Sequence, residues 1–292
     1  MTRFGIILCS SLTLFGQGST EIPFRYATPD LPLVLIEIRI NNSNKLTAVV
    51  DTGQGIAPVL VNQSIARDLG LVFSDSNRMV ATFGIGSGPP PQVFKSKIDA
   101  LRISGGNLGS MDAGVTPALG PIGDAIGQSI AANLGYRLFK DYTLSLNYQT
   151  MKLKLGKENV TNGLPFVLGP KKPLVIVDGR VNGQGPFRFV VDTGASNSAI
   201  SRTLAERLMM PRGMPIPVMG ASGTSPAYMT KATILEVAGR RFPEFTFATG
   251  DFLDRLSDAV GTHVDGVLGA NAFKNLVLRI DYPKQRLSLE NP

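Results

Sequence analysis

The chain has 292 residues, of which 43% are hydrophobic and 17% charged, a globular composition that excludes an intrinsically disordered protein. The net charge is +7, but Lys and Arg are scattered along the chain instead of clustering in a basic stripe, so we expect no nucleic-acid partner. The 32 Gly and 20 Pro residues, with little helical periodicity, predict an all-β architecture.

Residues 1–18 have the features of an export signal. Arg3 supplies the positive end, and the mostly apolar run from Phe4 to Phe15 is too short to span a bilayer. Small residues then allow cleavage after Gly18, with an uncleaved membrane anchor as the alternative. We therefore expect an exported protein, periplasmic or secreted, with no stable membrane insertion after cleavage.

The cysteine and histidine content limits the possible chemistry. Cys9, the only cysteine, lies inside the predicted signal, so the mature chain has no disulfide and no thiolate. His263 is the only histidine, and no Gly-x-Ser-x-Gly motif offers it a nucleophile, so we interpret it as a polar loop residue. A zinc site would depend on carboxylates alone. We therefore expect no metal and no cofactor.

The first half of the chain is predicted to contain β-strands, one short helix and a glycine-rich hairpin. Each half of the chain is predicted to contain one such helix, which begins at a residue type that caps helices well and ends before Gly or Pro. The predicted elements of the first half are the strand Leu33–Ile40, a turn at 41–44, the helix Asn62–Leu69, the hairpin Phe83–Gly88, and strands within Val93–Ile103, Tyr142–Asn147 and Lys152–Leu155.

The second half repeats the first. Val49-Val50-Asp51-Thr52-Gly53 recurs 141 residues later as Val190-Val191-Asp192-Thr193-Gly194. The matching elements are the strand Leu174–Val181, a turn at 182–185, the helix Ser201–Met209, the hairpin Met219–Gly223, and strands within Ala227–Val237, Leu276–Asp281 and Arg286–Leu289. The repeat predicts two similar lobes, residues 19–157 and 158–292, in a protein that acts as a monomer.

Two Asp-Thr-Gly turns at equivalent positions predict a shared site. One copy alone is typical of an ordinary turn, but both copies follow a buried apolar strand. We expect each Thr hydroxyl to bond the opposite half and each Gly to allow backbone amides close to a carboxylate. Two adjacent carboxylates cannot both ionise easily, so they share a proton. The ionised one could then activate water while the protonated one polarises a carbonyl.

These turns resemble the pepsin/retropepsin superfamily, as do Asp192–Ser196 and the closing segment Val264–Gly269, and the likeness is greatest to bacterial exported retropepsin-like aspartyl proteases. The resemblance implies two pseudo-symmetric β-barrel lobes around an active-site cleft, and an aspartic endopeptidase acting on peptide or protein substrates. It also implies that Asp265 is structural. The implied site residues are catalytic Asp51 and Asp192, turn residues Thr52, Gly53, Thr193 and Gly194, and flap residues Phe83, Gly84, Ile85, Gly86, Met219, Gly220, Ala221 and Ser222.

The first half departs from the family pattern. Gln54-Gly55 replaces the usual small residue and Ser or Thr, two extra residues precede the helix, and Asn133 stands where an apolar residue is expected. In the family these positions support the catalytic carboxylate. The alternative is therefore a catalytically impaired, peptide-binding relative. A self-processing protease with a narrow target is a third possibility.

Overall fold

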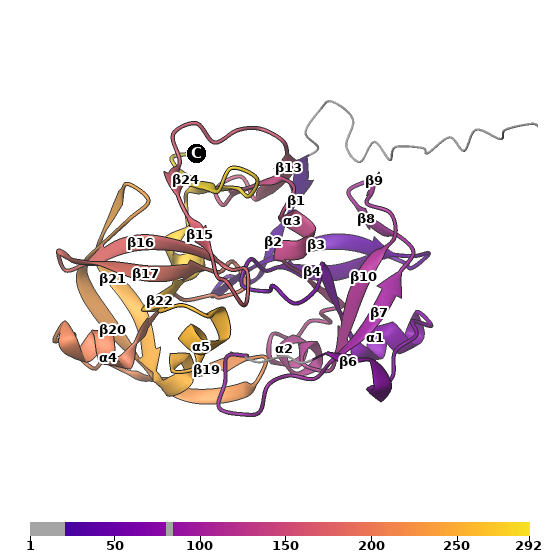
Figure 1. The fold of residues 1–292 in the computed structure, drawn as a ribbon, viewed down its shortest axis with the longest axis horizontal. Coiled ribbons are helices and arrows are strands. Elements are labelled where there is room, and N and C mark those ends of the chain that lie inside the picture. The colour runs from indigo at the N-terminus through magenta and orange to yellow at the C-terminus, as the bar shows by residue number, and fades with distance from the viewer. Residues whose placement is uncertain (1–20, 80–83) are drawn as a thin grey trace, which may run out of the picture.

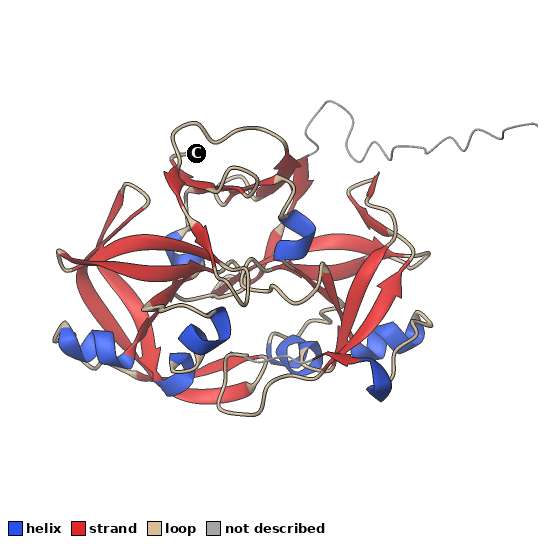
Figure 2. Ribbon diagram, viewed as in Figure 1, coloured by secondary structure: helices blue, strands red, loops and turns tan. Residues whose placement is uncertain are grey.

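A computed structural model of the chain describes residues 21–79 and 84–292 (Figure 1). The predicted export signal and Phe83 lie outside these residues. Strands dominate the described part and the helices are short, which confirms the prediction of a mostly β structure (Figure 2). None of the described helices is both long enough and apolar enough to cross a membrane.

The strands of the first half form a sheet that we call the N-terminal sheet. Its strands are β2 (Arg25–Thr28), β3 (Leu31–Ile40), β4 (Leu46–Val50), β5 (Val59–Asn62), β6 (Arg78–Met79), β7 (Val93–Ile98), β8 (Leu101–Ile103), β9 (Gly106–Asn107), β10 (Met111–Thr116) and β11 (Ala132–Leu134). Within the described residues their order is β6-β7-β10-β5-β11-β4-β3-β8-β9, and β2 pairs with β3. The strand β4, which leads to Asp51, therefore lies inside the sheet between β3 and β11.

The second half forms the C-terminal sheet. Its strands are β15 (Val167–Leu168), β16 (Val175–Val181), β17 (Gln184–Val191), β18 (Ala199–Ser201), β19 (Pro215–Gly220), β20 (Gly223–Val237), β21 (Arg240–Gly250) and β22 (Gly266–Leu268). Their order is β15-β16-β17-β22-β18-β21-β20-β19, and β16 also pairs with β20, so the sheet curls back on itself. The strand β17, which leads to Asp192, lies between β16 and β22.

The two sheets use the same register around the aspartates. Leu35 of β3 lies opposite Val49 of β4, and Ile176 of β16 lies opposite Val190 of β17. These pairs are separated by the 141 residues of the sequence repeat. Each aspartate strand also has a parallel neighbour, β11 for β4 and β22 for β17. The repeat in the sequence is therefore a repeat in strand pairing.

A third sheet combines strands from both halves. Its strands are β1 (Glu21–Pro23), β12 (Thr143–Asn147), β13 (Lys152–Gly156), β14 (Leu164–Pro165), β23 (Val277–Asp281) and β24 (Arg286–Glu290), in the order β1-β13-β12-β23-β24-β14. It lies at the top of Figure 1, above the other two sheets. The sequence repeat predicts that each closing strand pair belongs to its own half, whereas in the structure the two pairs are joined by the pairing of β12 with β23.

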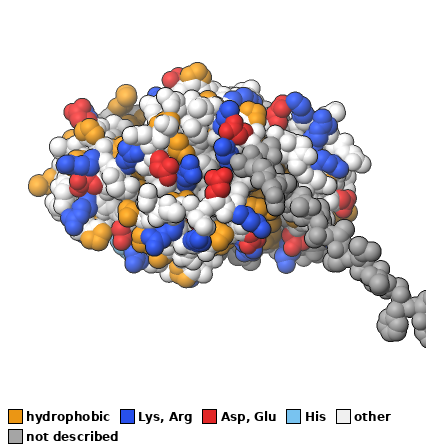
Figure 3. All heavy atoms as spheres, turned by 90° about the horizontal axis from the view of Figure 1, so that it is seen from above, with side chains coloured by type: hydrophobic (Ala, Val, Ile, Leu, Met, Phe, Trp, Pro, Cys, Tyr) orange, Lys and Arg blue, Asp and Glu red, His pale blue; other side chains and the backbone are white. Residues whose placement is uncertain are grey.

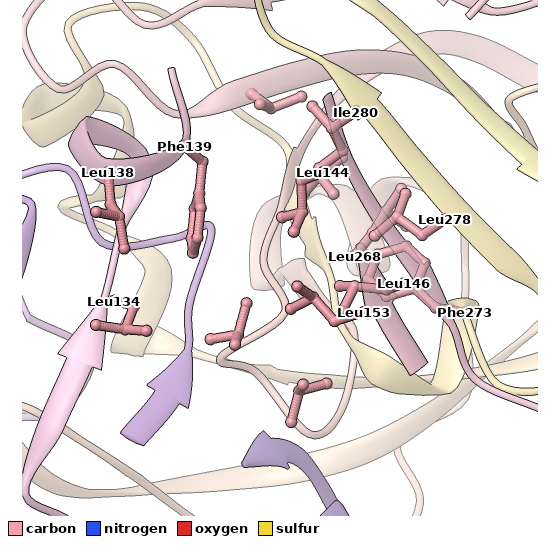
Figure 4. Packing of buried hydrophobic residues seen from close by; sticks show 14 of the residues in the cluster. Leu134, Leu138, Phe139, Leu144, Leu146, Leu153, Leu268, Phe273, Leu278 and Ile280 are labelled. Carbon is pink, nitrogen blue, oxygen red and sulfur yellow. The ribbon is translucent and has the colours of Figure 1, made fainter. Parts of the chain in front are cut away.

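Buried leucine and isoleucine side chains explain the pairing of β12 with β23. Leu144 of β12 lies opposite Ile280 of β23, Leu146 lies opposite Leu278, and all four are fully buried. Figure 4 shows these side chains beside Phe273, which belongs to the same core cluster. Burying a Leu or Ile side chain contributes roughly 1.5–3 kcal/mol, so the contact between the halves is a substantial part of the core.

The helices are short and cover the sheets. They are α1 (Gln63–Asp68), α2 (Leu119–Ala125), α3 (Tyr136–Phe139), α4 (Arg202–Arg207) and α5 (Leu256–Val260), with the 3₁₀ turns η1 (Asp75–Asn77), η2 (Asp251–Leu253) and η3 (Ala270–Ala272). The predicted caps are confirmed, since the Asn62 side chain accepts from the N–H of Ser64 and the Ser201 hydroxyl accepts from that of Leu204. Gly70, at φ +65°, ends the first helix as predicted.

Charges of both signs alternate over the third sheet. Figure 3, seen from above, shows Lys and Arg interspersed with Asp and Glu on this face. Glu21 of β1 pairs with Lys152 at 2.5 Å and with Lys154 at 3.1 Å, both from β13. The described residues of this face therefore form no continuous basic stripe, and the absence of a nucleic-acid partner stays a prediction.

Candidate active site

The two aspartates stand at equivalent strand ends. Asp51 follows β4, and its backbone N–H donates to the carbonyl of Leu134 at 2.9 Å. Asp192 follows β17, and its N–H donates to the carbonyl of Leu268 at 3.0 Å. The parallel neighbour strand of each sheet thus fixes the backbone from which the carboxyl group projects.

Thr52 and Thr193 connect the two turns. Both are fully buried. The Thr52 hydroxyl donates to the carbonyl of Val191 at 2.8 Å and accepts from the N–H of Thr193 at 3.0 Å. The Thr193 hydroxyl donates to the carbonyl of Val50 at 2.7 Å and accepts from the N–H of Thr52 at 3.1 Å. Four reciprocal hydrogen bonds therefore fix the turns against each other, as the sequence analysis expected of these hydroxyls.

The glycines of the turns allow the carboxyl groups to come together. A Cβ atom on Gly53 would lie 2.4 Å from Cγ of Asp192, and one on Gly194 would lie 2.5 Å from Cγ of Asp51. Real Cβ atoms do not approach other atoms so closely, so only glycine fits at either position. Each carboxyl group consequently packs against the turn of the other half.

The carboxyl groups of Asp51 and Asp192 lie close together, since each packs against the glycine of the other turn. Each has one hydrogen-bond donor, and the two donors differ. Oδ1 of Asp192 accepts from the backbone N–H of Gly194 at 2.8 Å, whereas Oδ2 of Asp51 accepts from the side-chain amide of Asn133 at 2.5 Å. The other oxygen of Asp51, Oδ1, is buried and has no hydrogen-bond partner within the described residues. The site is therefore asymmetric in its hydrogen bonds.

Burial and the charge of Asp51 together raise the pKa of Asp192 to about 8. Burial is the larger cause, because a carboxylate loses hydration among protein atoms. The hydrogen bond from Gly194 acts in the opposite direction, since it stabilises the ionised form. One proton is thus retained by the pair over a wide pH range.

Lys172 is a charged neighbour that the sequence analysis missed. It lies in the loop between β15 and β16, and its Cγ is 3.2 Å from the point that a Cβ on Gly55 would occupy. Burial lowers the pKa of its ammonium group, and the charges of Asp51 and Asp192 counteract this. No motif marks Lys172 in the sequence, because its place near the pair depends on the loop between β15 and β16.

The extra residues after the first turn are ordered by Gln54. Its side chain is buried, accepts from the N–H groups of Ile56 and Ala57, and donates to the carbonyl of Ala57 at 2.9 Å. Its carbonyl also accepts from the N–H of Tyr136 at 2.8 Å, just as the carbonyl of Ala195 accepts from Ala270 in the second half. Gln54 therefore supports the turn by a different set of bonds.

The residues expected to form two flaps lie together. Ser222, at the tip of the β19–β20 hairpin, donates its N–H to the carbonyl of Ile85 at 2.9 Å, and its carbonyl accepts from Gly88 at 2.7 Å. A Cβ on Gly220 would lie 2.5 Å from the carbonyl oxygen of Ile85. The hairpin predicted at Met219–Gly223 is present, with Ala221 beside Ser222 at its tip.

The glycine-rich segment of the first half is a loop rather than a pair of strands from Gly84 onward. Residues 84–92 contain no strand, and β6 and β7 pair outside this segment, with Arg78 opposite Phe94. Gly86, at φ +128°, packs against the hairpin backbone, where a Cβ would lie 2.5 Å from the carbonyl oxygen of Gly223. Proline residues follow at 89–91, and because proline has no N–H group they cannot donate to a strand ladder.

The remaining candidate residues have structural contacts. His263 bonds Oδ1 of Asp265 at 2.9 Å, and Oδ2 of Asp265 accepts from the N–H of Arg188 at 2.8 Å. Asp265 is nearly buried, so its place beside β17 agrees with a structural role. Among residues 21–79 and 84–292, no group of three His, Cys, Asp or Glu side chains is arranged to hold a metal ion.

Comparison with known families matches residues 177–272 to the family described as aspartyl protease. The matched region contains the Asp192 turn, the hairpin at 219–223 and the closing segment at 264–269. It supports an aspartyl protease family of the pepsin/retropepsin type, and does not extend to the altered turn at Asp51. No curated protein matches the sequence of the chain.

Proposed function

We propose that the chain is an aspartic endopeptidase whose catalytic groups are Asp51 and Asp192. The observation that carries the proposal is that two partly buried carboxyl groups from separate strand ends lie close together, each against the glycine of the other turn, where burial and the charge of Asp51 raise the pKa of Asp192. Each carboxyl group is in contact with the Asp-Thr-Gly turn of the other half. The match to the aspartyl protease family supports a hydrolase of this class.

The pair supplies a base and an acid for peptide hydrolysis. The ionised carboxylate removes a proton from a water molecule, and the protonated carboxyl group donates a hydrogen bond to the scissile carbonyl. Water then attacks the carbonyl carbon and forms a tetrahedral intermediate without a covalent bond to the enzyme. Transfer of the proton to the amine nitrogen breaks the C–N bond and releases two peptides.

The proposal includes the arrangement of the molecule. Each half forms one of two pseudo-symmetric β-barrel lobes, and an extended peptide lies in a cleft between them. The contact between Ile85 and Ser222 is the meeting point of two flaps over that peptide. Backbone hydrogen bonds from flap strands would hold the substrate, as in strand addition. The enzyme is exported, periplasmic or secreted, and works as a monomer on flexible protein segments.

The hydrogen bond from Asn133 to Asp51 favours one alternative. A donor on Asp51 competes with the substrate water for the same carboxylate, which would suit a peptide-binding protein with impaired catalysis. The ordered loop at Gln54 argues against a loosely held Asp51, so we place this alternative second.

A fluorogenic peptide library incubated from pH 3 to pH 8 tests the proposal. We expect cleavage that is blocked by a pepstatin-like inhibitor and reduced at least ~1,000-fold in both Asp51→Asn and Asp192→Asn, because each variant removes one half of the acid–base pair. Asp258→Asn, on the exposed side of α5, is the matched control and should cleave like the wild type.

Three results separate the candidates. Binding of library peptides without cleavage would favour the impaired relative. Cleavage confined to the protein's own chain, detected by mass spectrometry of the incubated protein, would favour self-processing. Cleavage that persists in Asp51→Asn would refute the assignment of the pair.

A further inference from the structure

Asn133 occupies the middle of the short strand β11, between the two strands that flank the first turn. It lies opposite Val49 of β4 and Leu60 of β5. In the C-terminal sheet the same position of β22 is Val267, which lies opposite Val190 of β17 and Ala199 of β18. The position beside each aspartate therefore carries an amide in one half and an isopropyl group in the other.

The direction of the Asn133 amide follows from the groups around it. Its NH₂ group donates to Oδ2 of Asp51 at 2.5 Å, and its Oδ1 is buried without a donor within the described part of the chain. In the opposite orientation two acceptor oxygens would face each other, and a buried NH₂ group would have no acceptor. An unpaired carbonyl oxygen is the more tolerable of the two in protein interiors. Asn133 is thus a donor to Asp51.

We propose that Asn133 is a positioning residue that keeps the negative charge of the pair on Asp51 and leaves the shared proton on Asp192. A donated hydrogen bond stabilises the ionised form of a carboxylate. Oδ1 of Asp51, which has no hydrogen-bond partner within the described residues, is then left to accept the proton that Asp192 carries. This inference rests on the proposed function only where it assigns Asp51 as the base and Asp192 as the acid.

The other groups that face the pair do not favour an ionised Asp51 over an ionised Asp192. Lys172 acts on both carboxyl groups. Tyr148, after β12, lies near Asp192, and Tyr282, after β23, lies near Asp51; burial raises the pKa of each hydroxyl, so both stay neutral. The N–H of Gly194 donates to Asp192 at 2.8 Å, longer than the 2.5 Å bond from Asn133. Asn133 is the one side-chain donor that distinguishes the two aspartates among residues 21–79 and 84–292.

Titration of the carboxyl carbons tests the inference independently of cleavage. The protein is labelled with ¹³C at the aspartate carboxyl groups, and its two site signals are assigned from Asp51→Asn and Asp192→Asn spectra. In the wild type we expect the step at lower pH to fall mainly on Asp51 and the later step mainly on Asp192. Because the two groups are coupled, the readout is how each step is divided between the carbons.

Exchanging the two side chains gives the matched variants. Asn133→Val should raise the lower step by about one pH unit and spread it over both carbons. Asn133→Val combined with Val267→Asn should move the lower step to Asp192. The acidic limb of the kcat/KM profile for peptide cleavage should shift with the lower step, whereas a purely structural role would change kcat/KM equally at all pH values.

The wild-type titration tests the proposal about Asn133 even if an Asn133 variant does not fold. A lower step on Asp192 would overturn the proposal, and so would an Asn133→Val protein that folds and titrates like the wild type. Absence of peptide cleavage together with the expected titration would refute the proposed function and leave the inference about Asn133 standing.

Discussion

Replacing Thr52 by Val tests how strongly the two turns depend on each other. Valine keeps the shape of threonine but has no hydroxyl, so the variant leaves the carbonyl of Val191 and the N–H of Thr193 without their partner. Thr52 is fully buried, and water cannot replace either bond without rearrangement. Each unpaired buried group costs about 1–3 kcal/mol, so the free energy of unfolding should fall by about 2–6 kcal/mol.

Urea unfolding followed by far-ultraviolet circular dichroism measures this loss. Thr52→Ser is the matched control, because it keeps the hydroxyl and removes only a methyl group, at about 1 kcal/mol. Thr193→Val should show the same loss as Thr52→Val, since its hydroxyl makes the mirror-related bonds. The reasoning fails if Thr52→Val unfolds at the same urea concentration as the wild type, or is more stable than Thr52→Ser.

Two further variants probe the carboxyl pair. Between pH 4 and pH 8 the free energy of unfolding of the wild type should fall by up to about 1.4 kcal/mol per pH unit relative to Asp192→Asn. The reason is that the pKa of Asp192 is 3.8 in the unfolded chain and about 8 in the folded chain, so unfolding releases a proton in this range. A free energy of unfolding that changes with pH in the same way in both proteins would contradict this. Gly194→Ala should reduce peptide cleavage at least ~100-fold, because its methyl group would lie 2.5 Å from Cγ of Asp51. Gly120→Ala is the control and should cleave normally, since the space around Gly120 is open. Equal activity of the two variants would contradict the close approach of Gly194 to Asp51.

The sequence was sufficient for features that depend on local pattern or on the repeat. The strand ends before Asp51 and Asp192, the capping by Asn62 and Ser201, and the turn threonines all follow from short motifs placed twice. Their signals are strong because the physical requirement is local: a strand must end, a cap must accept an N–H, and a glycine must admit a carboxylate.

Features that depend on which strands become neighbours were not predictable in this way. The pattern of β12 identifies a buried strand, but nothing in its residues says that its partner is β23 in the other half. Asn133 was interpreted as a departure from an apolar position, since its amide direction depends on the parallel pairing of β11 with β4. Lys172 carries no motif and reaches the pair only through the loop that positions it.

The third sheet also constrains the order in which the protein can be completed. When the chain has been synthesised as far as Gly156, β13 can pair with one side of β12, but the N–H and C=O groups on the other side stay unpaired until β23 has been made from Val277 onward. An open strand edge of this kind is a template for pairing with another chain. A fragment that ends before β23 would keep that edge permanently and should self-associate, so the last strands of the chain also protect the first half from aggregation.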